Sequence, residues 1–318
     1  KLVVVTGGSG FLGRHLVKHL RDQGAIVMEP GYDLRSLSGA NQTLNYMKSV
    51  SCVFHLAGFN GGVQFNAENP ADIFYQNTVM GLNLLEACRT HKVKKVVSIV
   101  ASCAYPESEW ENIGYGDFCE IKKEVMSEYD FLDGPPHDSV ACHGYAKRNL
   151  QLASSFYKQQ YGLDAVCVCP TTLYGPGDSL DPQRTKVLGA MVRRFVEAQR
   201  DSLPGVTCWG SGKPQREFLY VEDAAELIAR SALVYDDSNL PLNLGTGQEH
   251  SIANLANAVA SLAGYTGTIE WDTSKPDGQF RKRLDLTRMK QYLPDFLPTS
   301  LSEGLQRTIE WVRGQLCG

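Results

Sequence analysis

Long apolar runs are missing from the 318-residue sequence. A membrane-spanning helix needs roughly 20 consecutive apolar residues, and the longest apolar stretches here break within about ten, so the sequence excludes helical membrane spans. A signal-peptide pattern is missing too, because residues 1–6 already have the character of a strand. Any leader would therefore have been left out of this sequence, and we expect a cytoplasmic protein.

An excess of positive charge is also missing. The formal net charge is −4, with 43% hydrophobic and 21% charged residues, which is ordinary for a globular protein. This balance argues against nucleic acid or a membrane surface as a partner. It leaves room for a local basic pocket that binds phosphates.

The nine cysteines have no metal-ligand spacing, and their number is odd. We therefore expect reduced cysteines that mostly pack in the core, and no metal site. Cys167 and Cys169 share a face of an expected strand. Packing is the favoured role for both, with a metal or disulfide role as the lesser alternative.

Strand and helix patterns alternate along the first half of the chain. Expected strands cover residues 2–6, 25–28, 52–56, 95–100 and 165–170, and expected helices cover 11–23, 71–91 and 138–161. This order predicts an α/β fold, a Rossmann-like doubly wound parallel sheet. Further helices at 186–199 and 252–263 follow looser loops. We expect a dinucleotide-binding domain of residues 1–170 with 218–248, and a smaller C-terminal substrate-binding lobe of 171–217 and 249–318 above the carboxyl edge of the sheet.

The first expected strand runs into a glycine-rich loop. Gly7, Gly10 and Gly13 have the spacing G-x-x-G-x-x-G, with Phe11 and Leu12 opening the next helix. Such a loop lets the backbone approach a pyrophosphate and aims a helix N-terminus at its charge. The choice between NAD and NADP stays open, because Asp33 could hold a ribose and Arg35 or Arg14 could hold a 2′-phosphate.

Several motifs resemble those of the extended short-chain dehydrogenase/reductases, and most closely the GDP-L-fucose synthases. They are the glycine loop, Asn77 within residues 75–78, and residues 101–106, 145–148, 208–212, 216–218 and 275–278. The GDP-mannose 3,5-epimerases are the next closest family. The resemblance implies a homodimer formed through two long helices, a GDP-linked nucleotide-sugar substrate, and a nicotinamide cofactor, NADP or NAD, with NADP favoured.

The resemblance also assigns binding residues. Cofactor contacts are implied for Leu56, Ala57, Asn77 and Lys147, and substrate contacts for Asn60, Gly61, Gly62, Arg194, Trp209, Arg216 and Lys275. Arginine suits bidentate phosphate contacts, and tryptophan can stack on a base. The neighbouring run Arg281, Lys282 and Arg283 could add positive charge to the site or form a solvated basic face.

Three positions depart from the GDP-L-fucose synthase pattern. His143 stands where the family has a tyrosine four residues before Lys147, and Ala101 replaces a serine two residues before Cys103. Tyr145 cannot replace the tyrosine, because positions i and i+2 of a helix face different ways. These changes should weaken a reduction step, although His143 could act as a proton donor.

The third departure is Lys186, at a position where GDP-L-fucose synthases have histidine and GDP-mannose 3,5-epimerases are expected to have lysine. Cys103 and Lys186 then form a candidate acid–base pair, each shifting the pKa of the other toward neutrality, with Ser102 as a further catalytic candidate. Structural alternatives stay open. Cys103 could be a small residue closing a strand, and Lys186 a solvated residue opening a helix.

The sequence thus favours an enzyme that epimerises C3, C5 or both of a 4-keto GDP-sugar, with bound NAD(P). A full epimerase–reductase that uses NADPH is the main alternative. A dehydratase or other redox enzyme for an unusual sugar, and a non-catalytic NAD(P)- or nucleotide-sugar-binding protein, are further alternatives.

Overall fold

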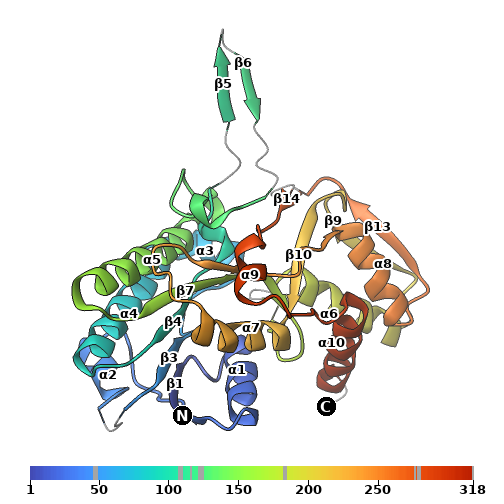
Figure 1. The fold of residues 1–318 in the computed structure, drawn as a ribbon. Coiled ribbons are helices and arrows are strands. Elements are labelled where there is room, and N and C mark those ends of the chain that lie inside the picture. The colour runs from blue at the N-terminus through green and yellow to red at the C-terminus, as the bar shows by residue number, and fades with distance from the viewer. Residues whose placement is uncertain are drawn as a thin grey trace.

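A computed structural model describes the chain apart from residues 46–48, 107–109, 115–116, 121–124, 182–184, 276, 278–280 and 317–318. Its centre is a six-stranded parallel sheet with the strand order β11-β7-β4-β3-β1-β2 (Figure 1). These strands are β1 (Leu2–Thr6), β2 (Ile26–Met28), β3 (Cys52–His55), β4 (Val96–Ile99), β7 (Ala165–Pro170) and β11 (Leu242–Leu244). The predicted Rossmann-like α/β sheet is confirmed.

Helices cover both faces of this sheet. On one face α4 (Pro70–Thr90) packs against α5 (Ala141–Tyr161), and α2 (Leu37–Gln42) packs against α4. On the other face α1 (Phe11–Asp22) packs against α7 (Val221–Val234) (Figure 1). All residues of strands β3 and β7 are buried, because a parallel sheet with helices on both faces excludes water from its central strands.

One predicted helix begins later than expected. Residues 138–140 form a 3₁₀ turn, and α5 starts at Ala141. The backbone N–H of Ser139 donates to Nδ1 of His137 at 3.2 Å, which caps the 3₁₀ turn. The predicted start was therefore three residues early, although the helix ends at Tyr161 as predicted, before Gly162 in the left-handed conformation.

A smaller lobe follows in the chain. It contains β9 (Gly205–Trp209) paired with β13 (Thr268–Asp272), and β10 (Gln215–Tyr220) paired with β8 (Thr172–Tyr174), β12 (Glu249–Ser251) and β14 (Arg281–Lys282). Helices α6 (Val187–Arg200), α8 (Ile252–Leu262) and α10 (Leu301–Leu316) share its own apolar core. The short helix α3 (Val63–Glu68) and the separate two-stranded sheet of β5 (Trp110–Gly114) and β6 (Asp117–Glu120) lie outside the large sheet and the two sheets of the smaller lobe (Figure 1).

The packing divides the chain less simply than the predicted domain boundaries. Leu284, Leu286, Met289 and Leu293 pack in the core of the large sheet, although the elements before and after them belong to the smaller lobe. Met289 lies in α9 (Thr287–Tyr292), and the three leucines lie just before and just after this helix. The chain therefore returns to the large sheet a second time, after β11 and before α10, and the boundaries themselves stay a prediction.

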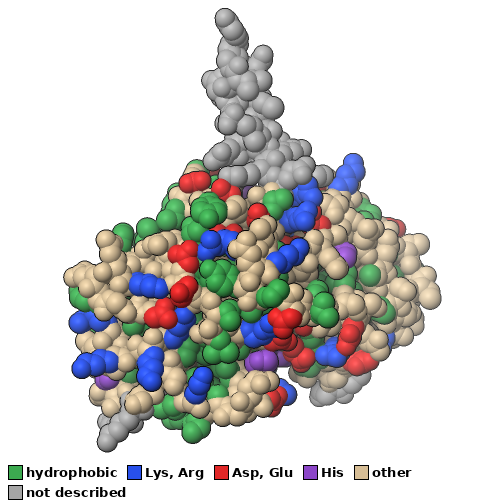
Figure 2. Space-filling view, viewed as in Figure 1, with side chains coloured by type: hydrophobic (Ala, Val, Ile, Leu, Met, Phe, Trp, Pro, Cys, Tyr) green, Lys and Arg blue, Asp and Glu red, His purple; other side chains and the backbone are tan. Residues whose placement is uncertain are grey.

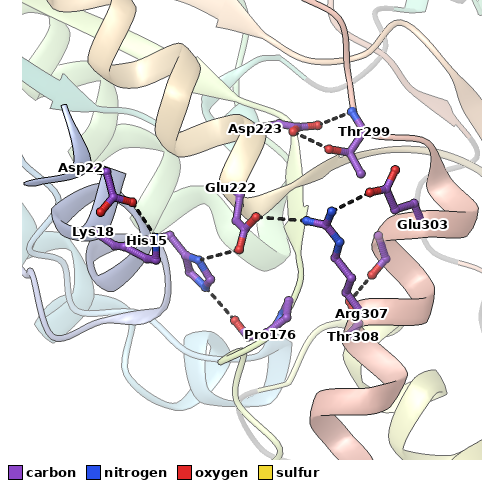
Figure 3. A network of polar contacts seen from close by, with 11 residues as sticks. His15, Lys18, Asp22, Pro176, Glu222, Asp223, Thr299, Glu303, Arg307 and Thr308 are labelled. Atoms are coloured by element: carbon purple, nitrogen blue, oxygen red, sulfur yellow. Dashed lines mark hydrogen bonds and ion pairs between the residues drawn. The ribbon is translucent and has the colours of Figure 1, made fainter. Parts of the chain in front are cut away.

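A polar network joins the two lobes (Figure 3). The ring of His15 on α1 lies 2.8 Å from the carbonyl oxygen of Pro176 and 3.9 Å from the carboxylate of Glu222 on α7. Arg307 on α10 donates to the same carboxylate at 3.3 Å. These partly exposed pairs each contribute at most about 1 kcal/mol, so their main effect is to orient α10 against α1 and α7.

The described residues contain no helix that could cross a membrane and no cluster of His, Cys, Asp or Glu that could hold a metal. Cys52, Cys88, Cys103, Cys142, Cys167, Cys169 and Cys208 are free, and Cys167 and Cys169 are buried side chains of β7. Burial raises the pKa of Cys167 to about 12, which fits a packing role. On the face drawn in Figure 2, acidic and basic side chains are interspersed.

Candidate active site

The glycine loop joins β1 to α1 at the carboxyl edge of the sheet. Gly7 has φ +71°, and a Cβ there would lie 2.7 Å from the backbone N of Ala57, directly after Leu56. A Cβ on Gly13 would lie 2.1 Å from the carbonyl oxygen of Gly7. Glycine is therefore required at both positions, because the loop packs against two other backbone segments.

The start of α1 is open to a ligand. Gly10 precedes the helix in an extended conformation and caps it without a side chain, and its N–H donates to the carbonyl oxygen of Gly7 at 3.0 Å. The first N–H groups of α1, from Phe11 and Leu12 onward, therefore point to the end of the loop without intrahelical partners. This geometry fits a dinucleotide pyrophosphate.

Two carboxylates follow β2 in different surroundings. Asp33 binds Arg35 in a bidentate ion pair, with Nη2 of Arg35 2.8 Å from Oδ2, and both side chains are more than half exposed. Glu29 instead lies against the glycine loop, because a Cβ on Gly8 would be 2.5 Å from its Oε2. Asp33 and Arg35, which were predicted to contact the cofactor, thus bind each other, and Glu29 is the acid that reaches the glycine loop.

Asn77 and Lys147 are both buried and bonded to backbone. Nδ2 of Asn77 donates to the carbonyl oxygens of Phe59 and Ile73, each at 2.7 Å, and Oδ1 accepts from the N–H of Phe59 at 3.0 Å. Nζ of Lys147 donates to the carbonyl oxygen of Ile99 at 2.9 Å. Asn77 thus shapes the loop after β3, and Lys147 fixes α5 to the end of β4. The cofactor contacts of both residues stay predictions.

Cys103 lies in the 3₁₀ turn Ser102–Ala104 directly after β4, and His143 lies in the first turn of α5. Sγ of Cys103 is 3.4 Å from Nδ1 of His143, which is hydrogen-bonding distance for sulfur. Nδ2 of Asn60 is 3.5 Å from the same ring nitrogen. The structure therefore brings together Cys103 and two other predicted site residues from separate loops.

Burial and positive charge set the protonation of this cluster. Burial, and then the charges of Lys147, Lys186 and Lys282, lower the pKa of His143 to about 3, so its imidazole is neutral. Burial also raises the pKa of the Cys103 thiol, against the opposite effect of the same lysines. The expectation that the pKa of Cys103 moves toward neutrality is therefore wrong for the free protein, because desolvation outweighs the lysines.

Lys282, which the sequence offered only as one member of the basic run Arg281, Lys282 and Arg283, acts on the site. It lies on β14, in register with Arg216 on β10, and it is the cation with the largest effect on the pKa of Cys103. Burial lowers the pKa of Lys282 itself. Its neighbour Arg281 binds the carboxylate of Glu249 at 2.8 Å instead. The alternation of side chains along a strand could have separated these two cations, had residues 281–282 been recognised as a strand.

A cavity of about 580 Å³ lies beside the cluster in the smaller lobe. Its lining includes Lys186, Arg194, Cys208, Trp209 and Trp271. Lys186, the predicted second catalytic residue, is the N-cap of α6 and lines this cavity. Lys186 is exposed, so its solvated alternative stays open, although its charge acts on both Cys103 and His143.

Two of the predicted substrate residues, Arg194 and Trp209, line this cavity. Trp209 is 67% exposed, so its ring face is available, and Nζ of Lys275 lies 5.7 Å from the ring centroid. Nη1 of Arg194 donates to the carbonyl oxygen of Thr207 at 2.7 Å. Arg216 is partly buried beside Lys282, and burial lowers its pKa. Gly61 and Gly62 lie directly after Asn60 and before α3, at the sheet side of the site.

Tyr145 does not enter this site. Its side chain is 43% exposed, whereas His143 and Lys147 on either side of it are buried. The prediction that Tyr145 faces away is confirmed, because residues two apart on a helix point in different directions.

Comparisons with known proteins agree with this geometry. Residues 3–245 match the model of the family described as "NAD dependent epimerase/dehydratase family". The chain is 33% identical to a GDP-L-fucose synthase of Escherichia coli over 97% of this chain and 95% of that protein. It is 32% identical to putative GDP-L-fucose synthase 2 of Arabidopsis thaliana over 97% of this chain and 90% of that protein.

A solved structure has the same fold. The GDP-L-fucose synthetase of Naegleria fowleri bound to NADP superposes with a TM-score of 0.85 at 26% identity, over 99% of this chain and 95% of that one. The glycine loop of the present chain fits the cofactor that the family name implies, so the protein uses NAD(P). With the family model covering most of its length, this chain belongs to the NAD-dependent epimerase/dehydratase family of extended short-chain dehydrogenase/reductases.

Proposed function

We propose that this protein is a nucleotide-sugar-modifying enzyme that epimerises C3, C5 or both of a 4-keto GDP-sugar. The observation that carries the proposal is the contact of Cys103 with a neutral imidazole: Sγ lies 3.4 Å from Nδ1 of His143, among three lysines. The names of the Escherichia coli and Arabidopsis relatives support a GDP-linked substrate.

Epimerisation next to a ketone needs a base, an acid and a positive environment for the enolate. The thiolate form of Cys103, which the charges of Lys282, Lys147 and Lys186 favour, removes the proton from the carbon beside the keto group, with the neutral imidazole of His143 as the hydrogen-bond partner of its sulfur. The electron pair moves to the keto oxygen, where Lys282 and Lys147 stabilise the negative charge. Lys186 delivers a proton to the opposite face of that carbon. One proton leaves and one arrives, so the step needs no reductant.

The same residues argue against efficient reduction at C4. Gly7, Gly10 and Gly13 would hold the dinucleotide, whose nicotinamide supplies hydride when bound. Reduction also needs an acid aimed at the keto oxygen, and His143 is a poor one because its imidazole is neutral. The alternative, a full epimerase–reductase, is favoured by the position of Lys147, which lies at the end of β4 where the nicotinamide is expected.

The proposal is tested with GDP-4-keto-6-deoxymannose in D₂O, with and without NADPH or NADH, following mass and NMR. Deuterium at C3 or C5 without consumption of reduced cofactor is the expected result. Deuterium entry together with a reduced product would establish the epimerase–reductase instead. No exchange and no reduction would contradict the assignment for this sugar.

Variants make this test specific. Cys103→Ser should abolish the exchange, whereas Cys142→Ser, which changes a thiol on α5 beside His143, should retain most of it. Equal loss in both variants would point to a general effect of thiol replacement. Exchange that survives in Cys103→Ser would remove Cys103 from the proposed chemistry.

A homodimer is part of the proposal. Helices α4 and α5 pack side by side and carry exposed apolar side chains. They are Phe74, Tyr75 and Leu82 on α4, and Phe156 and Tyr161 on α5. Two copies of this helix pair would bury these side chains in a four-helix interface.

A further inference from the structure

The end of β2 places a carboxylate at the dinucleotide loop. Glu29 follows β2 directly, about 20 residues after the loop glycines, the spacing of the acid that holds the adenosine ribose in Rossmann folds. Its Oε2 lies 2.5 Å from the position of a Cβ on Gly8. The carboxylate therefore reaches the loop backbone, although the side chain of Glu29 is still 32% exposed.

The orientation of this carboxylate is fixed from one side. Nη2 of Arg21 on α1 donates to Oε1 of Glu29 at 2.8 Å. The other oxygen, Oε2, is the one that lies against Gly8. A cavity of about 430 Å³, lined by Gly8, Ser9 and Glu29 among others, opens at this point. One oxygen thus binds the protein while the other lies beside the loop.

Three cations line the same cavity, and each has a partner. Arg21 binds Glu29, and Lys18 binds Asp22 at 2.5 Å. Nη2 of Arg14 donates to the carbonyl oxygen of Ser9 at 3.2 Å. Arg21 and Lys18 are therefore paired with carboxylates, and Arg14 is the lining cation that bonds a backbone carbonyl instead.

We propose that Glu29 makes this protein selective for NAD(H) over NADP(H). Oε2 accepts hydrogen bonds from the ribose hydroxyls of the adenosine half, and the carboxylate repels a phosphate at the 2′ position. This inference is independent of the sugar substrate. It also runs against the preference for NADP that the resemblance implies, because the family's motifs do not include the residue after β2.

Direct binding tests the proposal without any sugar. NADH and NADPH are titrated separately into the wild-type protein, with protein fluorescence or calorimetry as the readout. We expect NADH to bind at least about tenfold more tightly, a difference of about 1.4 kcal/mol. Competition by ADP and by 2′,5′-ADP places the effect at the ribose, and ADP should compete better.

Two variants separate Glu29 from the neighbouring acid. Glu29→Gln should tighten the binding of NADPH relative to NADH and so reduce the ratio. The matched control is Asp33→Asn, which removes a carboxylate of the same segment that is paired with Arg35, and it should leave the ratio unchanged. NADH binding in both variants also reports a folded site.

The proposal is overturned if wild-type protein binds NADPH as tightly as NADH, or if NADH does not bind. It is also overturned if Asp33→Asn changes the ratio while Glu29→Gln does not. Because no sugar is present, these outcomes are independent of whether the protein exchanges deuterium into a 4-keto sugar.

Discussion

The dinucleotide loop and the cluster around Cys103 lie at the same carboxyl edge of the parallel sheet, but they are built differently. The loop is one continuous segment whose shape depends on the missing side chains of Gly7 and Gly13. The cluster takes Asn60, Cys103 and His143 from three loops or helix ends. Lys147 comes from the same helix as His143, and Lys186 and Lys282 come from two further segments. The loop, whose shape is set by its backbone, is thus formed by residues that are neighbours in sequence. The cluster is formed by side chains that only the complete fold brings together.

The largest expected effect is on the loop. In Gly13→Ala the new Cβ would meet the carbonyl oxygen of Gly7 at 2.1 Å, so backbone must move and we expect a loss of about 1–3 kcal/mol in stability together with loss of NADH binding. Denaturant unfolding and NADH titration measure both. Gly31→Ala is the control, since its Cβ meets nothing within 4 Å. Normal NADH binding in Gly13→Ala would show that the loop is not set by backbone contact.

The next effect concerns chemistry alone. Cys103→Ser should reduce deuterium exchange into the 4-keto sugar by about 10²–10⁴-fold, because an acid–base group is removed. NADH affinity should stay within about twofold, since that affinity depends on the loop. A parallel loss of NADH binding would mean that the two sites are one structural unit, which would weaken the contrast between them.

A smaller effect is expected at Trp209, the side chain predicted to stack on the base of the nucleotide. Trp209→Ala should weaken GDP binding by about tenfold, because stacking on a base contributes about 1–3 kcal/mol. Lys275→Ala should weaken it less, and Lys290→Ala, an exposed lysine of α9, should leave it unchanged. Isothermal titration with GDP gives the three values. An unchanged affinity in Trp209→Ala would place the base elsewhere in the cavity.

The pH dependence of stability reports the buried histidines. The pKa of His143 in the folded state is about 3, below the ordinary value of about 6.5, so the unfolded chain binds a proton that the folded chain does not. Stability is therefore complete above pH 6.5 and falls as the pH drops from 6.5 toward 3, by up to about 1.4 kcal/mol per pH unit.

His143→Gln should reduce this slope by up to one proton, measured by urea unfolding between pH 7 and 4.5. Part of the slope should remain, because burial also lowers the pKa of His55 to about 3. An identical slope in wild type and His143→Gln would mean that His143 is not held neutral by the fold.

The smallest effect on activity is expected at the proposed dimer face. Phe156→Glu places a charge at a 58% exposed position of α5 and should shift the protein from dimer to monomer in light scattering. Leu297→Glu, at an 87% exposed position, should not. A wild-type monomer, or an unchanged dimer in Phe156→Glu, would contradict the proposed interface.

Much of the fold was predictable from local pattern. The buried apolar run 165–170 is a strand with the predicted bounds, and the Gly-terminated helix ends at Tyr161 as predicted. These elements depend on periodicity and capping, which are properties of neighbouring residues. The start of α5 was missed, because the 3₁₀ turn before it is fixed by a single cap at His137 that has no helical signature.

The site was predictable in part. The sequence alone determined the glycine loop, which rests on residue type and spacing. The candidacy of Cys103 and the absence of tyrosine at position 143 followed from the resemblance of the motifs to those of the GDP-L-fucose synthases. Only the tertiary structure decided that His143 touches Cys103, that Lys282 joins the cluster from β14, and that Glu29 rather than Asp33 lies at the loop. Contacts between distant segments, and the desolvation that controls the pKa of Cys103, exist only once the chain has packed.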